Sequence, residues 1–352
     1  MSNPLPVLAE VRRGPIVESW HRGVIVIADP DGHLVFSYGD ADLVTSTRST
    51  IKPIQALPII LSGAADHYQL TPRELAVACA SHEGEAIHTE TAAHMLARVG
   101  LDESALRCGA HAPYHTATAR QLELDGLPFN QLHNNCSGKH AGMLVTAVHR
   151  GLETEDYVAA THPVQLDIVE ALTRLGDLQA PLPTAIDGCS APTFGVPLRG
   201  LAVAAARLAN ACCDTAAQIA LDPETAAAAR RLVNAMIAYP EMIGGTQGRF
   251  DTDLMRAARG KLMAKVGAEA VYSVSVLPSE KYPRGLGLAF KMEDGSYRGL
   301  GPTVIETLRQ IGVLDETETM QLTTYHRPVI ENRRGLHVGE VRAIFDLRLN
   351  QQ

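Results

Sequence analysis

The spacing of apolar residues predicts a β-hairpin near the start of the chain. Residues 16–38 hold two runs of branched and aromatic side chains, and the turn sequence Asp29-Pro30-Asp31-Gly32 separates them. Short runs of this composition on both sides of such a turn are typical of paired antiparallel strands.

After the hairpin, the apolar residues recur at helical intervals. This spacing predicts helices from Ile54 onward and then at four later segments, which are 88–99, 137–150, 164–175 and the Ala-rich stretch 197–235. The apolar run at 74–80 fits either a helix or a buried strand. Much of the region between residues 100 and 136 is irregular, so we expect loops there.

The carboxyl-terminal part returns to a strand-like pattern. Residues 270–280 and 284–301 are rich in branched and aromatic side chains, with an Asp-Gly turn at 294–295, and a helix is predicted at 302–312. We therefore expect an α/β fold in which both chain ends build one sheet around a helical insertion. We treat residues 1–352 as a single catalytic unit, with a discontinuous α/β lobe (about 1–75 and 255–352) around a middle lobe (about 76–254).

Composition limits the classes of partner. The chain has 352 residues, 46% of them hydrophobic, which is enough for a large buried core. A net charge of −8 and the lack of Lys/Arg runs argue against nucleic-acid binding. No long apolar run indicates a membrane span or a secretion signal, so we expect a soluble cytoplasmic protein. The six cysteines follow no disulfide-framework spacing, and we expect reduced thiols.

The strongest local chemical signal is a serine that precedes a lysine by three residues. Ser49 and Lys52 stand at a predicted helix start, where one turn brings such positions to the same side. A serine hydroxyl needs a neighbouring base to become a nucleophile, and a desolvated lysine can be that base. The alternative is a helix-capping serine beside a solvated lysine.

Two polar loops carry cysteines that are candidate metal ligands. One loop contains Cys136 and Lys139, and the other contains Asp187 and Cys189. Two thiolates and a neutral lysine amine would make a mixed sulfur and nitrogen zinc site if the fold joined the loops. The alternative is a pair of ordinary buried thiols. Further possible ligands are His111, His115, His133 and His140.

Seven segments of the chain, taken in order, resemble the rhizobial-type L-asparaginases, also called the asparaginase II family. They are VESWHRG (17–23), RSTIKP (48–53), SHEGE (81–85), CGAHAPY (108–114), NNCSGKHAGM (134–143), DGCSAPTFG (187–195) and AKVGAE (264–269). The resemblance covers most of the chain. It implies a fold related to serine β-lactamases and glutaminases, a homodimer, and hydrolysis of L-asparagine to L-aspartate and ammonia.

The resemblance also assigns roles to residues. Ser49 matches the nucleophile and Lys52 the lysine of a first Ser-Lys tandem, while Ser81 and Lys265 match a second tandem. Lys265 fits the family pattern K-x-G-A-E better than Lys261, which lies four residues earlier. The resemblance further implies one zinc ion, with Cys136, Lys139 and Cys189 as its ligands, and it places Asp187 in a loop near the substrate. We expect Asp187 to bind the ammonium group of the substrate and Arg48 its carboxylate, and we add His140 as a third candidate for substrate binding.

Two other readings stay open at this point. One is a glutaminase or β-lactamase-like serine hydrolase that acts on another amide, although the chain contains no SDN or KTG triplet. The other is a non-enzymatic metal- or ligand-binding module, which would keep the cysteine and lysine cluster without needing a nucleophile.

Overall fold

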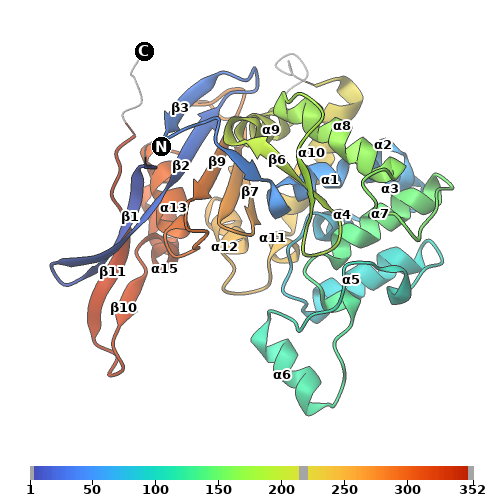
Figure 1. Cartoon of the computed structure of the whole chain (residues 1–352), viewed down its shortest axis with the longest axis horizontal. Helices are drawn as coiled ribbons and strands as arrows, with labels where there is room; N and C mark the ends of the chain where they lie inside the picture. Colours follow the sequence, from blue (N-terminus) through green and yellow to red (C-terminus); the bar gives the residue numbers. More distant parts are fainter. Residues whose placement is uncertain (1–3, 214–220, 348–352) are drawn as a thin grey trace.

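One antiparallel sheet joins the two ends of the chain in the computed structural model, which describes residues 4–213 and 221–347 (Figure 1). Among these residues, eight strands form the sheet, and β1 pairs with both β2 and β11. The strands across the sheet are β10 (Val329–Glu331), β11 (His337–Ala343), β1 (Val7–Arg13), β2 (Ile16–Ala28), β9 (Leu286–Met292), β8 (Val271–Val276) and β7 (Leu262–Gly267), with β3 (Leu34–Tyr38) paired to the second half of β2.

The helices are mostly inserted between β3 and β7. They are η1 (Arg48–Ile51), α1 (Lys52–Gln55), α2 (Leu57–Leu61), α3 (Ala64–His67), α4 (Pro72–Ala78), α5 (Ala86–Ala97), η2 (Glu103–Ala105), α6 (Thr116–Leu124), η3 (Gln131–His133), α7 (Ser137–His149), α8 (Pro163–Gly176), α9 (Leu198–Asn210), α10 (Pro223–Ala238), α11 (Pro240–Ile243), α12 (Phe250–Ala257), α13 (Leu300–Gln310), α14 (Glu316–Gln321) and α15 (Thr323–His326). A small second sheet consists of β4 (Val44–Ser46), β6 (Pro192–Pro197) and β5 (Thr184–Ile186).

This architecture confirms the expected α/β class, with a sheet from both chain ends and a helical insertion. The hairpin of β2 and β3 is present, and the ambiguous run at 74–80 is largely helical, in α4. The Ala-rich segment 197–235 forms α9 and α10, and residues 214–220 of that segment lie outside the described residues. The α10 helix has a strong start signal, because the Asp222 side chain accepts from Thr225 N and proline follows the cap.

Several strands were not predicted. The most consequential is β7, whose run Leu-Met-Ala-Lys-Val-Gly places a lysine in the middle of an otherwise apolar strand. Lys265 is nevertheless fully buried. β1, β10, β11 and the small sheet were missed as well, since short or half-exposed strands give little periodic signal.

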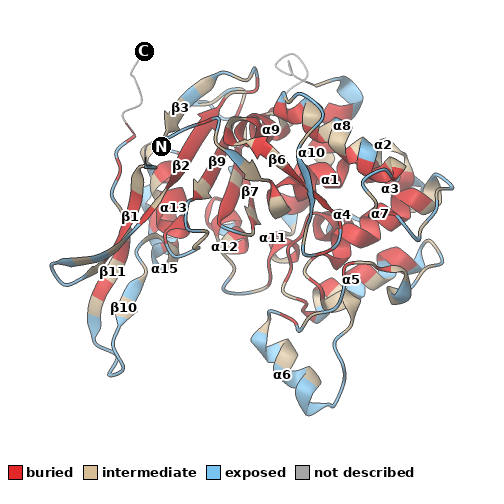
Figure 2. Ribbon diagram, viewed as in Figure 1, coloured by how far each residue is buried: buried red, intermediate tan, exposed pale blue. Residues whose placement is uncertain are grey.

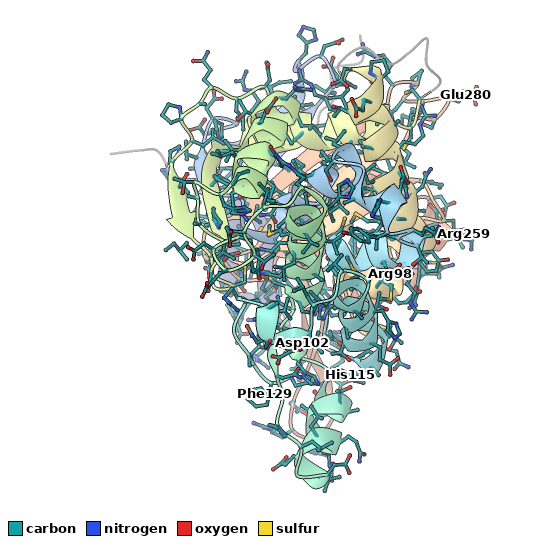
Figure 3. All side chains as sticks on the ribbon, turned by 90° about the vertical axis from the view of Figure 1, so that its right-hand side faces the viewer. Arg98, Asp102, His115, Phe129, Arg259 and Glu280 are labelled. Atoms are coloured by element: carbon teal, nitrogen blue, oxygen red, sulfur yellow. The ribbon has the colours of Figure 1, made fainter. Side chains whose placement is uncertain are left out.

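Helix α9 packs across the middle of the main sheet, against β2, β8 and β9, and both partners are largely buried (Figure 2). The expected lobe boundaries at about 75 and 255 stay a prediction. Not all helices join the core: α6 projects from the body near Phe129 and has no buried residue (Figure 3). In the part of the chain that the structure describes, no helix is long and apolar enough to cross a membrane.

The close packing of α9 on β9 predicts a stability defect. A Cβ atom on Gly287 would lie 1.9 Å from Ala202 O and 2.2 Å from Ala206 N, both backbone atoms of α9. Rotating a side chain cannot relieve this overlap, so Gly287→Ala should lower the free energy of unfolding by roughly 1–3 kcal/mol or more. The control is Gly188→Ala, whose added Cβ would enter open space. Chemical denaturation measures the free energy of unfolding of both variants, and equal values would contradict the packing argument.

Candidate active site

Ser49 lies at the junction between the small sheet and the first helices. Strand β4 ends at Ser46, and buried Thr47 is held by a hydrogen bond from its amide to Phe194 O on β6 (2.8 Å). The next residue, Arg48, has φ +44°, in the left-handed region that non-glycine residues rarely adopt. This sharp reversal starts η1 and leaves Ser49 half-buried on the wall of a cavity. Strained backbone of this kind is concentrated at functional sites.

The cavity has a volume of about 730 Å³. It lies between the loops that precede α7, β6 and α12 and the end of β7. Of the residues that the sequence singled out, its wall contains Arg48, Ser49, Ser81, His111, Cys136, Asp187 and Cys189. These residues bring two serines, an arginine, an imidazole, a carboxylate and two thiols to the wall.

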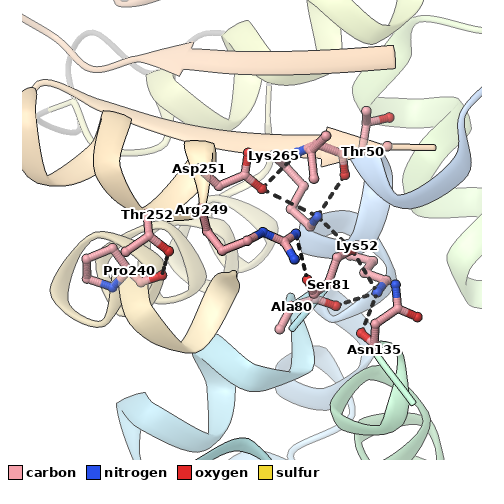
Figure 4. Close-up of polar contacts among 12 residues, drawn as sticks. Thr50, Lys52, Ala80, Ser81, Asn135, Pro240, Arg249, Asp251, Thr252 and Lys265 are labelled. Atoms are coloured by element: carbon pink, nitrogen blue, oxygen red, sulfur yellow. Dashed lines mark hydrogen bonds and ion pairs between the residues drawn. The ribbon is translucent and has the colours of Figure 1, made fainter. Parts of the chain in front are cut away.

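Ser81 is placed between two buried lysines, as Figure 4 shows. Lys52 Nζ donates to Ser81 Oγ over 3.1 Å, and Lys265 Nζ donates to the same oxygen over 2.9 Å. Lys52 also donates to the carbonyls of Ala80 and Asn135, and Lys265 to that of Val266. One hydroxyl thus links an amine from the amino-terminal part of the chain with an amine from the carboxyl-terminal part.

Ser49 and Lys52, the serine and lysine three positions apart, do not form the expected side-chain pair. The Lys52 backbone amide donates to Ser49 O, but within the described residues no hydrogen bond joins the Ser49 hydroxyl to the Lys52 amine, which donates to Ser81 Oγ instead. Lys261, the alternative lysine of the second tandem, makes no hydrogen bond to Ser81 in the described chain. Its amine donates to Glu318 instead (2.7 Å). Lys265 is therefore the lysine that geometry brings to Ser81.

Burial changes the proton affinity of one of these lysines. Lys265 has no exposed surface, and desolvation lowers its pKa to about 7. Asp251 opposes this effect, while the positive charges of Lys52 and Arg249 add to it. A lysine with such a pKa exchanges its proton near neutrality, as a general base must.

Arg48 and Asp187 form an ion pair at the cavity wall. Arg48 Nε donates to Asp187 Oδ1 over 2.8 Å, and the same oxygen accepts from Gly188 N. Among the described residues, the remaining guanidinium nitrogens of Arg48 and Asp187 Oδ2 have no hydrogen-bond partner. The two side chains predicted to bind the α-carboxylate and the α-ammonium group of an amino acid therefore lie together. Each keeps polar atoms that a substrate could contact.

The predicted zinc ligands are also brought together. Lys139 Nζ donates to Cys189 Sγ over 3.0 Å, and the Cys136 thiol donates to Asn135 Oδ1 over 3.4 Å; the side chains of Cys136, Lys139 and Cys189 are all buried. The Cys136 thiol and the Lys139 amine lower the pKa of Cys189, and the interaction with Cys189 raises that of Cys136 well above the ordinary thiol value. Burial works to lower the pKa of Lys139, but the two sulfurs outweigh it and raise that pKa.

His140 takes a different position from the other candidates. Its ring is fully buried, its Nδ1 is 2.7 Å from the Tyr157 hydroxyl, and it is not part of the cavity wall in the described chain. Burial lowers its pKa, so it is neutral at neutral pH. Cys189 opposes this effect on the His140 pKa, whereas the charge of Lys139 adds to it.

Two residues that the sequence did not single out complete the cluster. Arg249 donates to Ser81 O (3.2 Å) and to Glu83 Oε1 (3.3 Å), and Asp251 Oδ2 lies 3.8 Å from Lys265 Nζ. Nothing local distinguishes Asp251 from any carboxylate in the first turn of a helix.

Comparison with solved structures finds chains of low identity. A probable glutaminase from Bacillus subtilis, complexed with 6-diazo-5-oxo-L-norleucine, is 14% identical; the alignment covers 83% of this chain and 84% of that one, with a TM-score of 0.40. The Bacillus subtilis glutaminase in covalent complex with 5-oxo-L-norleucine is 15% identical, with 83% and 88% covered and a TM-score of 0.40. Both are glutaminases, the kind of protein whose fold the sequence predicted, but at these scores no functional property passes from them to this chain.

A comparison of the sequence with protein families gives a direct assignment. No curated protein matches the chain. The family model described as L-asparaginase II, however, matches residues 9–343, which is nearly the whole length. The match includes every segment on which the resemblance was based, from Val17 to Glu269. The chain therefore belongs to the L-asparaginase II family, and it is an amidohydrolase of the asparaginase and glutaminase kind.

Proposed function

We propose that the protein hydrolyses L-asparagine to L-aspartate and ammonia through a covalent ester on Ser49. The observation that carries the proposal is the convergence of Lys52 and Lys265 on Ser81 Oγ, next to Ser49 on the wall of one cavity. Two buried amines around a hydroxyl form a proton relay, and structural packing alone gives no reason to bury them there.

The Arg48–Asp187 pair supports recognition of an amino-acid substrate. The free nitrogens of Arg48 suit the α-carboxylate, and Asp187 Oδ2 suits the α-ammonium group. Fixing both groups at one end of the cavity sets how far the side-chain amide reaches toward Ser49.

We propose the following chemical steps, in which the Lys52 amine turns from Ser81 to the Ser49 hydroxyl when substrate is bound. Ser49 Oγ attacks the amide carbon while its proton moves to the neutral amine of Lys52, and that proton then joins the nitrogen as the C–N bond breaks and ammonia leaves. A water molecule next attacks the Ser49 ester, its proton passes to the same relay, and aspartate leaves with Ser49 restored. Lys265, through Ser81, takes up the proton that Lys52 must lose before each attack.

The donor set at the two loops fits a zinc ion. Cys136 and Cys189 would supply sulfur to the ion and Lys139 would supply nitrogen, and we expect a water molecule as the fourth ligand. When bound, zinc would hold the loop around Cys136 against the loop around Cys189 through positive charge. We therefore propose a supportive and not strictly catalytic zinc. The expected homodimer and cytoplasmic location stay predictions.

Replacing the nucleophile should abolish turnover. Ser49→Ala should lower kcat by roughly 10³-fold or more with fold and zinc content unchanged, and Ser81→Ala should be damaging by a similar or smaller factor. Lys52→Arg should also fail, because arginine keeps its proton. Ammonia release measures each variant, with Ser37→Ala on the distant hairpin as the control.

Acid quench or a reactive asparagine analogue should add the acyl mass to the peptide that contains Ser49. Mass on Ser81 would mean that the two tandems have exchanged roles. Near-normal activity of Ser49→Ala would rule the mechanism out.

L-asparagine should be strongly preferred over L-glutamine. With the α-groups held by Arg48 and Asp187, one extra methylene moves the amide carbon away from Ser49, and we expect kcat/KM to fall by about 100-fold. Steady-state kinetics with both amides measures the ratio. Arg48→Lys should reduce kcat/KM for asparagine, because the single lysine nitrogen cannot replace the planar guanidinium group that pairs with Asp187 and still offers two further nitrogens to the substrate. Equal kcat/KM values for the two amides would instead favour the glutaminase reading.

One zinc ion per chain should copurify with the protein when no chelator is used. Elemental analysis should find it lost in Cys136→Ser and Cys189→Ser and retained in Cys212→Ser, whose sulfur lies outside the cavity wall. Because the ligands must lose protons, zinc affinity should fall as the solution is acidified. Chelation should raise KM more than it lowers kcat. Absence of zinc before and after its addition would refute this assignment.

A further inference from the structure

The buried surroundings of Lys265 contain more positive than negative groups. Among the described residues, the charged or ionisable side chains around its amine come from four segments and are Lys52, Cys79, Cys136, Arg249 and Asp251. Arg249 already has a counter-charge, because it pairs with Glu83 (3.3 Å). Asp251 is thus the carboxylate left to balance the two lysines, with its Oδ2 3.8 Å from Lys265 Nζ (Figure 4).

Asp251 is held in place inside the protein. It is 2% exposed, and its Oδ2 accepts from the amide of Val266, the neighbour of Lys265 on β7 (3.1 Å). Burial, and then the charge of Asp251, raise the pKa of nearby Tyr272 well above its ordinary value, so Tyr272 stays protonated. A buried carboxylate is costly without a positive charge beside it, and Lys265 is the lysine that lies beside Asp251.

We propose that Asp251 is a positioning residue that keeps the shared proton on Lys265 and thereby leaves Lys52 as the free base. The transfer is balanced: Lys52 gives a proton to Ser81 Oγ, and Ser81 gives its own proton to Lys265. Only N–H and O–H bonds change. The net result moves one positive charge from Lys52 to Lys265, which lies beside Asp251. The catalytic consequence rests on the proposed function, whereas the placement of the proton does not.

Direct titration of Lys265 tests this placement without requiring activity. NMR of protein carrying ¹³C-labelled lysine side chains, assigned with Lys265→Gln, reports the protonation of each amine. Removing a negative charge favours the neutral amine, so Asp251→Asn should lower the pKa of Lys265 by at least about one unit. Asp251→Glu should largely preserve it. The matched control is Asp253→Asn, on the same helix, whose Oδ2 accepts from Tyr325 OH and which does not face Lys265.

The pH dependence of kcat for asparagine gives the second readout. In Asp251→Asn the proton spends more time on Lys52, so kcat at its optimum should fall about tenfold and the whole profile should move toward lower pH. KM should change little, because Asp251 balances the relay and not the Arg48–Asp187 pair. A purely structural role would lower activity without moving the pH profile.

The outcomes separate the two proposals. An unchanged Lys265 titration in Asp251→Asn overturns this inference, whatever the activity. A shifted titration in a protein that hydrolyses neither asparagine nor glutamine supports the inference and counts against the proposed function. If Asp251→Asn does not fold, adding Lys265→Met should restore folding, because the unbalanced lysine would be the cause; failure of the double variant would assign Asp251 a structural role and overturn the proposal.

Discussion

The site depends on the burial of two lysine amines around one hydroxyl. Lys52 and Lys265 are both essentially inaccessible to water, and Ser81 accepts from both. Two ammonium groups at this separation repel each other, so such a pair persists only where a carboxylate, carbonyl oxygens and partial deprotonation offset the cost. Asp251 and the carbonyls of Ala80, Asn135 and Val266 supply these partners. The surrounding elements must therefore meet accurately for the pair to exist.

The main features of the fold could be predicted from local patterns. Helical spacing located α5, α7, α8 and α13 to within a few residues, and branched residues around turns located β2, β3, β8 and β9. Strand β7 was not found, because a lysine at its centre breaks the apolar run. That lysine is buried only because the sheet and α12 close over it, and the local sequence carries no sign of either.

The candidate site was partly visible in the sequence and partly not. The spacing of Ser49 and Lys52 suggested a nucleophile and a base, but the hydrogen bond from Lys52 goes to a serine 29 positions away. Ser81 and Lys265 are separated by 184 positions, so no periodicity relates them, and only the family resemblance placed them together. Asp251 and Arg249 were missed altogether, since each is ordinary in its own segment and becomes unusual only through what folds against it.

The pairing of β1 with β11 has a consequence for synthesis of the protein. A chain emerging from the ribosome exposes β1 and half of the relay long before its partners exist, because β7 and β11 are among the last strands to be made. Contacts between such distant segments form slowly, and unpaired strand edges are prone to aggregation meanwhile. A nascent chain that ends before residue 265 lacks the second amine, so the relay is assembled only near the end of translation.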